Sequence, residues 1–211
     1  MERQFHTRKR QASEALAGLS NSSYDDRIYQ LTSRAQVLER CRAMLERCRH
    51  VAVMDIFPTL VPALCEDIET AAARGVEVVV KAYEKTKLRD VRIVVRPRGH
   101  EITGAMPGEM LSLNIDGAEH LLAVMPHEGD GVHQAIWTGS AVISYLLYNG
   151  LVNEVSEVAL MNELEKDTTV QKLRGVFASL RHLHPISSRG PVYQNLLDRL
   201  GTGGVTIAND Q

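Results

Sequence analysis

The stretch from Glu39 to Ala82 constrains the fold most, because helix and strand patterns alternate within it at short intervals. The segments HVAVMDIF and VEVVVKA are short, rich in valine and almost unbroken in apolar residues, which is typical of strands covered on both faces of a sheet. A helix pattern from Thr59 to Ala73 lies between them. The order strand, helix, strand predicts a right-handed crossover that joins parallel strands.

The segments around this unit predict a larger mixed sheet. IYQL reads as a short strand, and a helix is expected to begin near Ser33. Further strands are expected at VRIVVRPRG, GEMLSLNIDG, AEHLLAVMP and VHQAIWTGS, and HEITGAMPG reads as a turn-rich loop. The DG pair at 116–117 indicates a hairpin. A long helix is expected from about Ser140 to Glu165, which completes an α/β fold with helices flanking the sheet.

The two ends of the chain predict helices outside this sheet. In residues 1–19 the apolar side chains Phe5, Leu16 and Leu19 recur near heptad spacing, so this segment either pairs with a second copy or docks on its own domain. Residues 168–183 and VYQNLLDRL give two more helix patterns. We therefore divide the chain into a lead-in helix and linker (1–26), a central domain (27–167) and a helical extension (168–211).

Composition excludes several classes of protein. The net charge of −2 gives no sign of a large nucleic-acid surface, and no apolar run approaches the roughly 20 residues that span a bilayer. Without a signal-peptide pattern, the chain is expected in the cytoplasm. Its three cysteines fall on apolar helix faces and are expected to be buried, structural thiols: Cys41, Cys48 and Cys65.

Metal and cofactor motifs are missing from the sequence. His127 and His133 flank an acidic loop, yet their spacing matches no familiar metal site. The glycine-rich nucleotide loops, the G-x-S-x-G elbow and paired C-x-x-C motifs are also absent. The sequence therefore predicts neither a metal nor a cofactor.

One constellation resembles the phospholipase D-like fold. In that superfamily the half-site has the form HxKxxxxDG on a strand, followed by GSxN. In this chain the pattern falls on Glu109 and Leu111, then Asp116, and then Ser140 after Gly139. Glu109 replaces the nucleophilic histidine, Leu111 the lysine, and valine the asparagine of GSxN. Phosphodiester transfer needs that imidazole and that cation, so the resemblance implies the fold without its reaction.

The same order of segments resembles the effector domain of TrmB-like, sugar-sensing transcriptional regulators. The resemblance rests on the lead-in helix, AQVLERCRAMLERCRHVAVMDIF, AAARGVEVVVKAY, SLNIDGAEHLLAVMP and VHQAIWTGSAVISYLL. It implies a phospholipase D-like sensor that binds a sugar-like effector, forms a homodimer through its N-terminal helix and contacts DNA only through a winged-helix domain. No winged helix precedes residue 1 in this sequence, and the helices after residue 168 have no counterpart.

Candidate ligand residues follow from the rule that ligands bind beyond the carboxyl ends of strands in open α/β sheets. Carboxylates, hydroxyls and one indole at these positions suit a neutral polyol or sugar. Two alternatives stay open: a repurposed phosphodiesterase-like enzyme that uses Glu109 or His120, and a pure dimerisation module. The candidates are Asp55, Phe57, Lys81, Tyr83, Glu109, Asp116, Trp137, Thr138 and Ser140.

Overall fold

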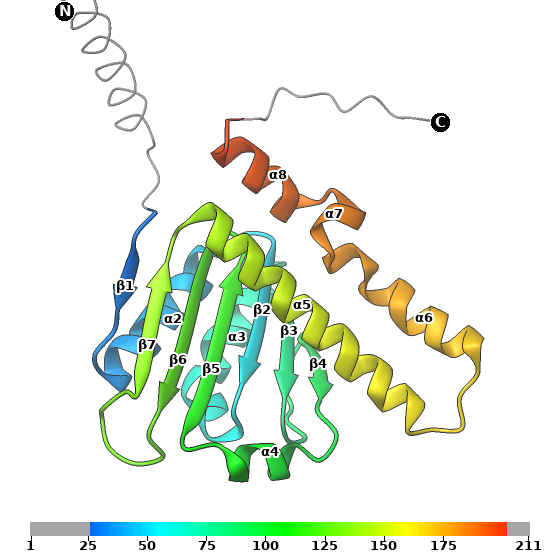
Figure 1. The fold of residues 1–211 in the computed structure, drawn as a ribbon, viewed down its shortest axis with the longest axis horizontal. Coiled ribbons are helices and arrows are strands. Elements are labelled where there is room, and N and C mark those ends of the chain that lie inside the picture. Colours follow the sequence, from blue (N-terminus) through cyan, green and yellow to red (C-terminus); the bar gives the residue numbers. More distant parts are fainter. Residues whose placement is uncertain (1–25, 202–211) are drawn as a thin grey trace, which may run out of the picture.

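A mixed sheet forms the centre of the structure, a computed structural model that describes residues 26–201 (Figure 1). Within that part the sheet has seven strands in the order β1-β7-β6-β5-β2-β3-β4. Strands β2, β3 and β4 are parallel, and every other neighbouring pair is antiparallel. The strands are β1 Ile28–Gln30, β2 Val51–Ile56, β3 Glu77–Ala82, β4 Arg92–Val95, β5 Glu109–Ile115, β6 Glu119–Met125 and β7 Gln134–Thr138.

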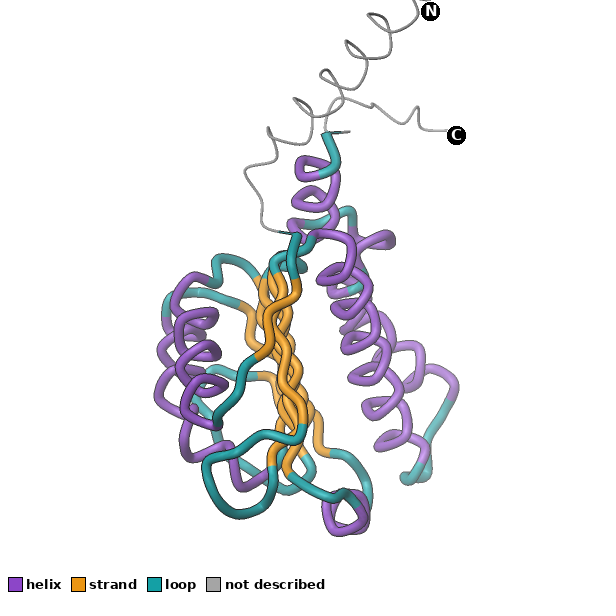
Figure 2. The backbone as a smooth tube through the Cα atoms, turned by 60° about the vertical axis from the view of Figure 1, so that its left-hand side comes forward, coloured by secondary structure: helices purple, strands orange, loops and turns teal. Residues whose placement is uncertain are grey.

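Helices cover both faces of this sheet, as Figure 2 shows. Helices α2 and α3 pack on one face, and α5 crosses the other face diagonally with the C-terminal helices beside it. This arrangement confirms the predicted fold class, a mixed α/β sheet flanked by helices. The helices are α2 Arg34–Arg47, η1 Pro58–Leu60, α3 Val61–Ala73, α4 Gly99–Ala105, α5 Ala141–Leu164, α6 Val170–Leu180, η2 Arg181–Leu183, α7 Pro185–Ser188 and α8 Pro191–Arg199.

Local signals in the sequence explain where several elements begin and end. Ser33 caps α2, since its side chain accepts a hydrogen bond from the backbone N–H of Gln36. Gly75, with φ of 89°, takes the left-handed conformation that ends α3 and turns the chain into β3. Arg74 donates to the carbonyl of Leu45 at 2.7 Å, so the residue that ends α3 also satisfies the end of α2. These contacts fix the helix–strand crossover that the sequence predicts.

Two apolar cores lie on the two faces of the sheet. Met54 and Val80 point toward α2 and α3, where they pack with Leu64 and their neighbours. Val53 and Val79 point the other way, toward α5. Because side chains alternate along a strand, β2 and β3 contribute to both cores, which explains why their sequences are almost unbroken in apolar residues.

The C-terminal helices pack against α5 and the turn after β5. The Tyr148 hydroxyl on α5 donates to the carbonyl of Leu183 at 3.0 Å. Val192 on α8 lies so close to Gly117 that a Cβ at position 117 would come within 2.4 Å of it. The glycine therefore lets α8 approach the hairpin, and Arg199 donates to the carbonyls of Ala118 and Gly139 beside it.

Some expectations from the sequence were wrong. The segment HEITGAMPG contains helix α4, and α3 begins at Val61 after one turn of 3-10 helix. Cys41 and Cys48 are buried as predicted, but Cys65 is partly exposed because it lies at the rim of α3. The predicted lead-in helix falls in residues 1–25, outside the described part of the chain. No helix among residues 26–201 is long and apolar enough to cross a membrane.

Candidate functional site

The predicted site residues divide between the two ends of the sheet. Asp55 and Lys81 lie near the carboxyl ends of β2 and β3, whereas Asp116 and Ser140 follow β5 and β7. Because β5 is antiparallel to β2, its carboxyl end lies at the opposite end of the sheet. The structure therefore brings Asp55, Phe57, Lys81 and Tyr83 together and leaves the other candidates elsewhere.

Asp55 and Lys81 form a buried ion pair under α5. They are register partners on β2 and β3, and Lys81 Nζ lies 2.7 Å from Asp55 Oδ2. Glu154 reaches from α5 to the same ammonium group. The Tyr83 hydroxyl donates to Asp55 Oδ2 at 3.3 Å, and the Phe57 ring meets the Tyr83 ring edge to face. The cluster ties α5 to the centre of the sheet.

Burial changes the titration of this cluster. Desolvation raises the pKa of Asp55 above its ordinary value, although the Lys81 ammonium opposes this change. Burial also raises the pKa of Tyr83 to about 12, and the Asp55 carboxylate adds to the effect. The pKa of Lys81 is raised because its two carboxylate partners outweigh the desolvation of the ammonium. Lys81 therefore stays charged and acts as the centre of the ion-pair network.

Glu109 lies near the same end of the sheet but on its other face. It is two residues from Leu111 on β5 and therefore shares the face of the sheet on which Leu111 packs, under α2 and α3. Its carboxylate forms an ion pair with Arg34 of α2, with 2.6 Å between Oε2 and Nη1. The residue at the position of the phospholipase D-like nucleophile is thus paired with a cation and anchors a helix.

Asp116 has a structural role at the β5–β6 hairpin, where its carboxylate accepts backbone hydrogen bonds. Its φ of 55° places it in the left-handed region that the turn requires. Oδ2 accepts the backbone N–H of Arg49 at 2.9 Å, and Oδ1 accepts those of His50 and Val51, each at 2.9 Å. The carboxylate therefore holds the loop that leads into β2, and three backbone donors occupy its oxygens.

Thr138 and Ser140 are buried where β7 ends. The Thr138 hydroxyl accepts the backbone N–H of Ser140 at 3.0 Å and donates to the carbonyl of Arg27 at 2.9 Å. Ser140 occupies the N-cap position of α5, yet its side chain makes no capping hydrogen bond. The predicted start of α5 was correct.

A buried polar network under the start of α5 was not predicted. The two ring nitrogens of His120 lie 3.3 Å from Ser112 Oγ and 3.1 Å from Asn114 Nδ2. Asn114 also donates to the carbonyl of Ser144 at 2.8 Å. Burial lowers the pKa of His120 to about 4, so the ring is neutral at pH 7. Alternation along β5 and β6 could have indicated that Asn114 and His120 share a face, but not that α5 covers them.

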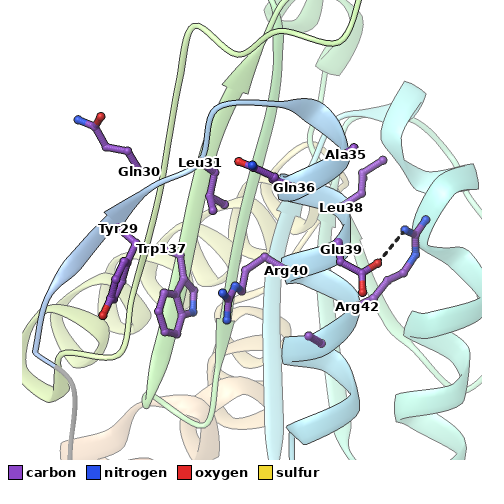
Figure 3. A pocket seen from close by; sticks show the side chains of 11 residues that line it. Tyr29, Gln30, Leu31, Ala35, Gln36, Leu38, Glu39, Arg40, Arg42 and Trp137 are labelled. Carbon is purple, nitrogen blue, oxygen red and sulfur yellow. Dashed lines mark ion pairs between the residues drawn. The ribbon is translucent and has the colours of Figure 1, made fainter.

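Trp137 lines a groove between α2 and the strands β1 and β7. The groove has a volume of about 1220 Å³. Figure 3 shows Tyr29 beside Trp137 and the guanidinium group of Arg40 directed at the indole. The groove is lined by Tyr29, Leu31, Gln36, Leu38, Glu39, Arg40, Arg42 and Trp137, among others.

Contacts within the groove fix its aromatic floor. The ring centroids of Tyr29 and Trp137 are 5.2 Å apart, because the two residues are register partners on β1 and β7. Arg40 Cζ lies 4.1 Å from the centroid of the Trp137 ring system, in cation–π contact. The indole N–H donates to Glu119 at 2.9 Å, and Arg47 pairs with the same carboxylate. The indole is therefore held in place from three sides.

The two arginines that line the groove, Arg40 and Arg42, differ in their carboxylate partners. Arg42 interacts with Glu39 and Asp67, at 3.8 and 3.5 Å. Arg40 forms no ion pair with any residue of the described part. Among residues 26–201 no cluster of three or more histidine, cysteine or acidic side chains could hold a metal ion. The groove thus offers an aromatic surface, several amide and carboxylate groups, and one guanidinium group without a carboxylate partner in that part.

Comparison with known proteins identifies distant structural similarities. No family model matches the chain, and no curated protein matches it in sequence. TrmBL2, an archaeal chromatin protein with a novel mode of DNA binding, is similar over 74% of this chain and 63% of its own, with 15% identity and a TM-score of 0.45. The present chain thus spans less than two thirds of TrmBL2.

A second solved structure, NucT from Helicobacter pylori, is similar over 60% of this chain and 96% of its own. The sequence identity is 10% and the TM-score 0.44. What this chain binds therefore rests on its own residues.

Proposed function

We propose that this chain is a non-catalytic, ligand-sensing domain of a TrmB-like transcriptional regulator, and that it binds a sugar or similar small polar effector. The observation that carries the proposal is the groove floored by Tyr29 and Trp137. Ligand sites are typically concave surfaces with aromatic lining and a few polar groups that fix orientation. This groove has that composition, and α2 holds its polar wall.

The chemistry of the groove suits a ring with polar substituents. An indole face accommodates the apolar face of a pyranose, while Gln36 and Glu39 offer hydrogen-bond partners for hydroxyl groups. Arg40 has no carboxylate partner in the described part, so a phosphorylated or acidic sugar should bind more tightly than the neutral parent sugar. The phosphate or carboxylate of such a ligand would pair with the Arg40 guanidinium, which also contacts the Trp137 indole.

The proposal includes the absence of catalysis, and the environments of two residues, Glu109 and His120, support it. Glu109, at the position of the nucleophile in the phospholipase D-like pattern, is a buried carboxylate paired with Arg34. His120, the other candidate, is buried with both ring nitrogens engaged, and its lowered pKa of about 4 leaves no imidazolium at pH 7 to act as a general acid. Both side chains are buried and engaged by other groups of the protein, which supports a domain without phosphoryl transfer.

Intrinsic fluorescence provides a direct test, because Trp137 is the only tryptophan in the chain. We expect sugars, and more strongly sugar phosphates, to change its emission in a saturable titration of the full chain. Arg40→Gln should weaken binding of the phosphorylated ligand about tenfold in calorimetry, since one charge-assisted hydrogen bond is lost. Arg49→Gln, an exposed arginine just beyond α2, should bind as the wild type does.

Two outcomes would contradict this proposal. If Tyr83→Phe weakened binding while Arg40→Gln did not, the ligand would lie at the Asp55–Lys81 cluster and not in the groove. Turnover of bis-(p-nitrophenyl) phosphate that Glu109→Gln abolished would show that the domain is an enzyme.

A further inference from the structure

Helix α5 exposes apolar side chains on the side that faces away from the sheet. Of the eight large apolar side chains that are exposed among the described residues, five belong to α5 and α6. On α5 the exposed fractions reach 62% for Leu146 and 61% for Leu164. On α6 they are 66% for Val170 and 52% for Phe177. Scattered apolar residues are normal on a protein surface, but a concentration on two adjacent helices indicates an interaction surface.

Four apolar side chains of α5 form a row along the helix. Val142, Leu146 and Leu164 are exposed, and Leu160 is half-buried beside α6. The four residues are spaced by four or fourteen positions, so they lie within about 40° of one another around the helix axis. The sheet-facing residues Leu151 and Val155 lie on the opposite side and are buried. We call these four residues the outer row of α5. An apolar stripe on a helix is normally covered by another element, whereas three of these four side chains are exposed in the described part of the chain.

A groove runs beside the outer row. It has a volume of about 420 Å³, and Leu160, Val170 and Phe177 supply its apolar lining. Two arginines also line the groove, Arg174 on α6 and Arg181 at the start of η2. An apolar groove of this kind accepts the apolar face of a helix. Its two cations favour a helix that carries a carboxylate next to that face.

The outer row itself meets this description. Residues 141–153 of α5 contain no charged side chain, and Glu157 is an exposed acid three residues before Leu160. Neither Glu157 nor Arg174 forms an ion pair with another described residue. An isologous contact would place the outer row of each copy on the groove of the other and would bring Glu157 of each copy toward Arg174 of its partner. The surface is therefore complementary to itself in both polarity and charge.

We propose that the outer row of α5 and the groove beside α6 form the interface of a homodimer. This assigns a role to the C-terminal helices, and it is independent of the ligand proposed for the Trp137 groove. The interface lies on the face of the sheet opposite α2. A ligand in the Trp137 groove and a second protomer on α5 could therefore be bound at the same time.

Sedimentation velocity of the full chain over the micromolar range tests this interface. The wild type is expected to show a dimer. Leu164→Glu should weaken dimerisation about a hundredfold, because each protomer loses one buried leucine from the interface. Ile186→Glu is the matched control, since Ile186 is 71% exposed on α7 and lies outside the interface. Far-UV circular dichroism should show that both variants fold, because each replaced side chain is exposed.

Charge reversal distinguishes this interface from any other mode of dimerisation. Glu157→Arg and Arg174→Glu should each weaken the dimer about tenfold through like-charge repulsion at two symmetric contacts, and the double variant should restore it. Glu101→Arg on α4 is the control for a general effect of charge. A wild type that is monomeric throughout this range would overturn the proposal. So would a dimer that withstands all these changes but is lost when residues 1–19 are deleted.

Discussion

At the scale of single residues, the polar side chains buried under α5 form two groups of hydrogen bonds and ion pairs. His120 bonds Ser112 and Asn114, and Asp55 bonds Lys81 and Tyr83, on the same face of the sheet. A buried polar network in a low-dielectric interior adds specificity, since each group is costly to leave unpaired. In this network Asp55 Oδ1 is buried without a hydrogen-bond partner among the described residues. These residues therefore determine how α5 sits on the sheet as much as the apolar core does.

The pH dependence of stability should report on His120. Its pKa is about 4 in the folded protein because burial disfavours the imidazolium, whereas an unfolded histidine titrates near 6.5. The unfolded chain therefore binds a proton that the folded chain does not, and stability is lost as the pH falls from 6.5 toward 4. We expect this residue to contribute a loss of about 3 kcal/mol across that range, measured as the free energy of unfolding in urea.

The comparison that isolates His120 uses two variants. His120→Gln should flatten the slope between pH 6.5 and 4, whatever its stability at neutral pH. His100→Gln, which changes an exposed histidine on α4, should keep the wild-type slope. Equal slopes in all three proteins would show that folding does not lower the pKa of His120.

At the scale of elements, α2 and α3 show how far amphipathic spacing predicts burial. Cys41 and Cys48 lie on the stripe of α2 that faces the sheet and are buried. Cys65 was placed on the apolar face of α3 together with Leu64 and Ile68. In the structure Leu64 and Ile68 are buried, whereas Cys65 is partly exposed. Adjacent residues of a helix are rotated by about 100° around its axis, so Cys65 points away from the direction of Leu64 and is less buried.

Thiol reactivity should separate these cysteines. Burial raises the pKa of the Cys41 and Cys48 thiols well above their ordinary values, so little thiolate is available there. A thiol reagent should label one cysteine quickly in the native protein and all three in denaturant. Cys65→Ser should remove the fast phase. If Cys41→Ser removed it instead, α2 would be displaced from the sheet in solution.

At the scale of the whole molecule, the C-terminal helices share a core with the sheet. Leu180, Leu183 and Val192 pack in the same cluster as Val53 and Val79 of the central strands. Residues up to Arg199 also bond the β5–β6 hairpin. The division of the chain at residue 168, drawn from the sequence, remains a prediction about independent units, and these shared contacts favour a single cooperative unit instead.

Unfolding experiments test that cooperativity. The fluorescence of Trp137 and the far-UV circular dichroism of the helices should change at the same urea concentration. Truncation after Asp167 should shift both midpoints strongly downward, because it uncovers Tyr148 and its apolar neighbours on α5. Truncation after Gly201 should leave them in place. A separate early transition in circular dichroism alone would show that the extension unfolds independently.

The sequence by itself determined the elements whose cause is local. The apolar runs of β2 and β3 indicated strands covered on both faces, because such strands lack the apolar–polar alternation of strands with one exposed face. The left-handed Gly75, the Ser33 cap and the hairpin at Asp116 follow from the backbone preferences of single residues. For the same reason the beginning of α5 was correct to one residue.

Tertiary structure alone decided how the polar residues are grouped. The candidates were chosen as if all strand ends met at one edge of the sheet, but β5 and β7 run opposite to β2, so Asp116 and Ser140 lie at the far end from Asp55. Strand direction depends on contacts between segments far apart in the chain, which single-residue preferences do not encode. The pairing of β1 with β7, which places Tyr29 beside Trp137, joins residues more than a hundred positions apart and is decided in the same way.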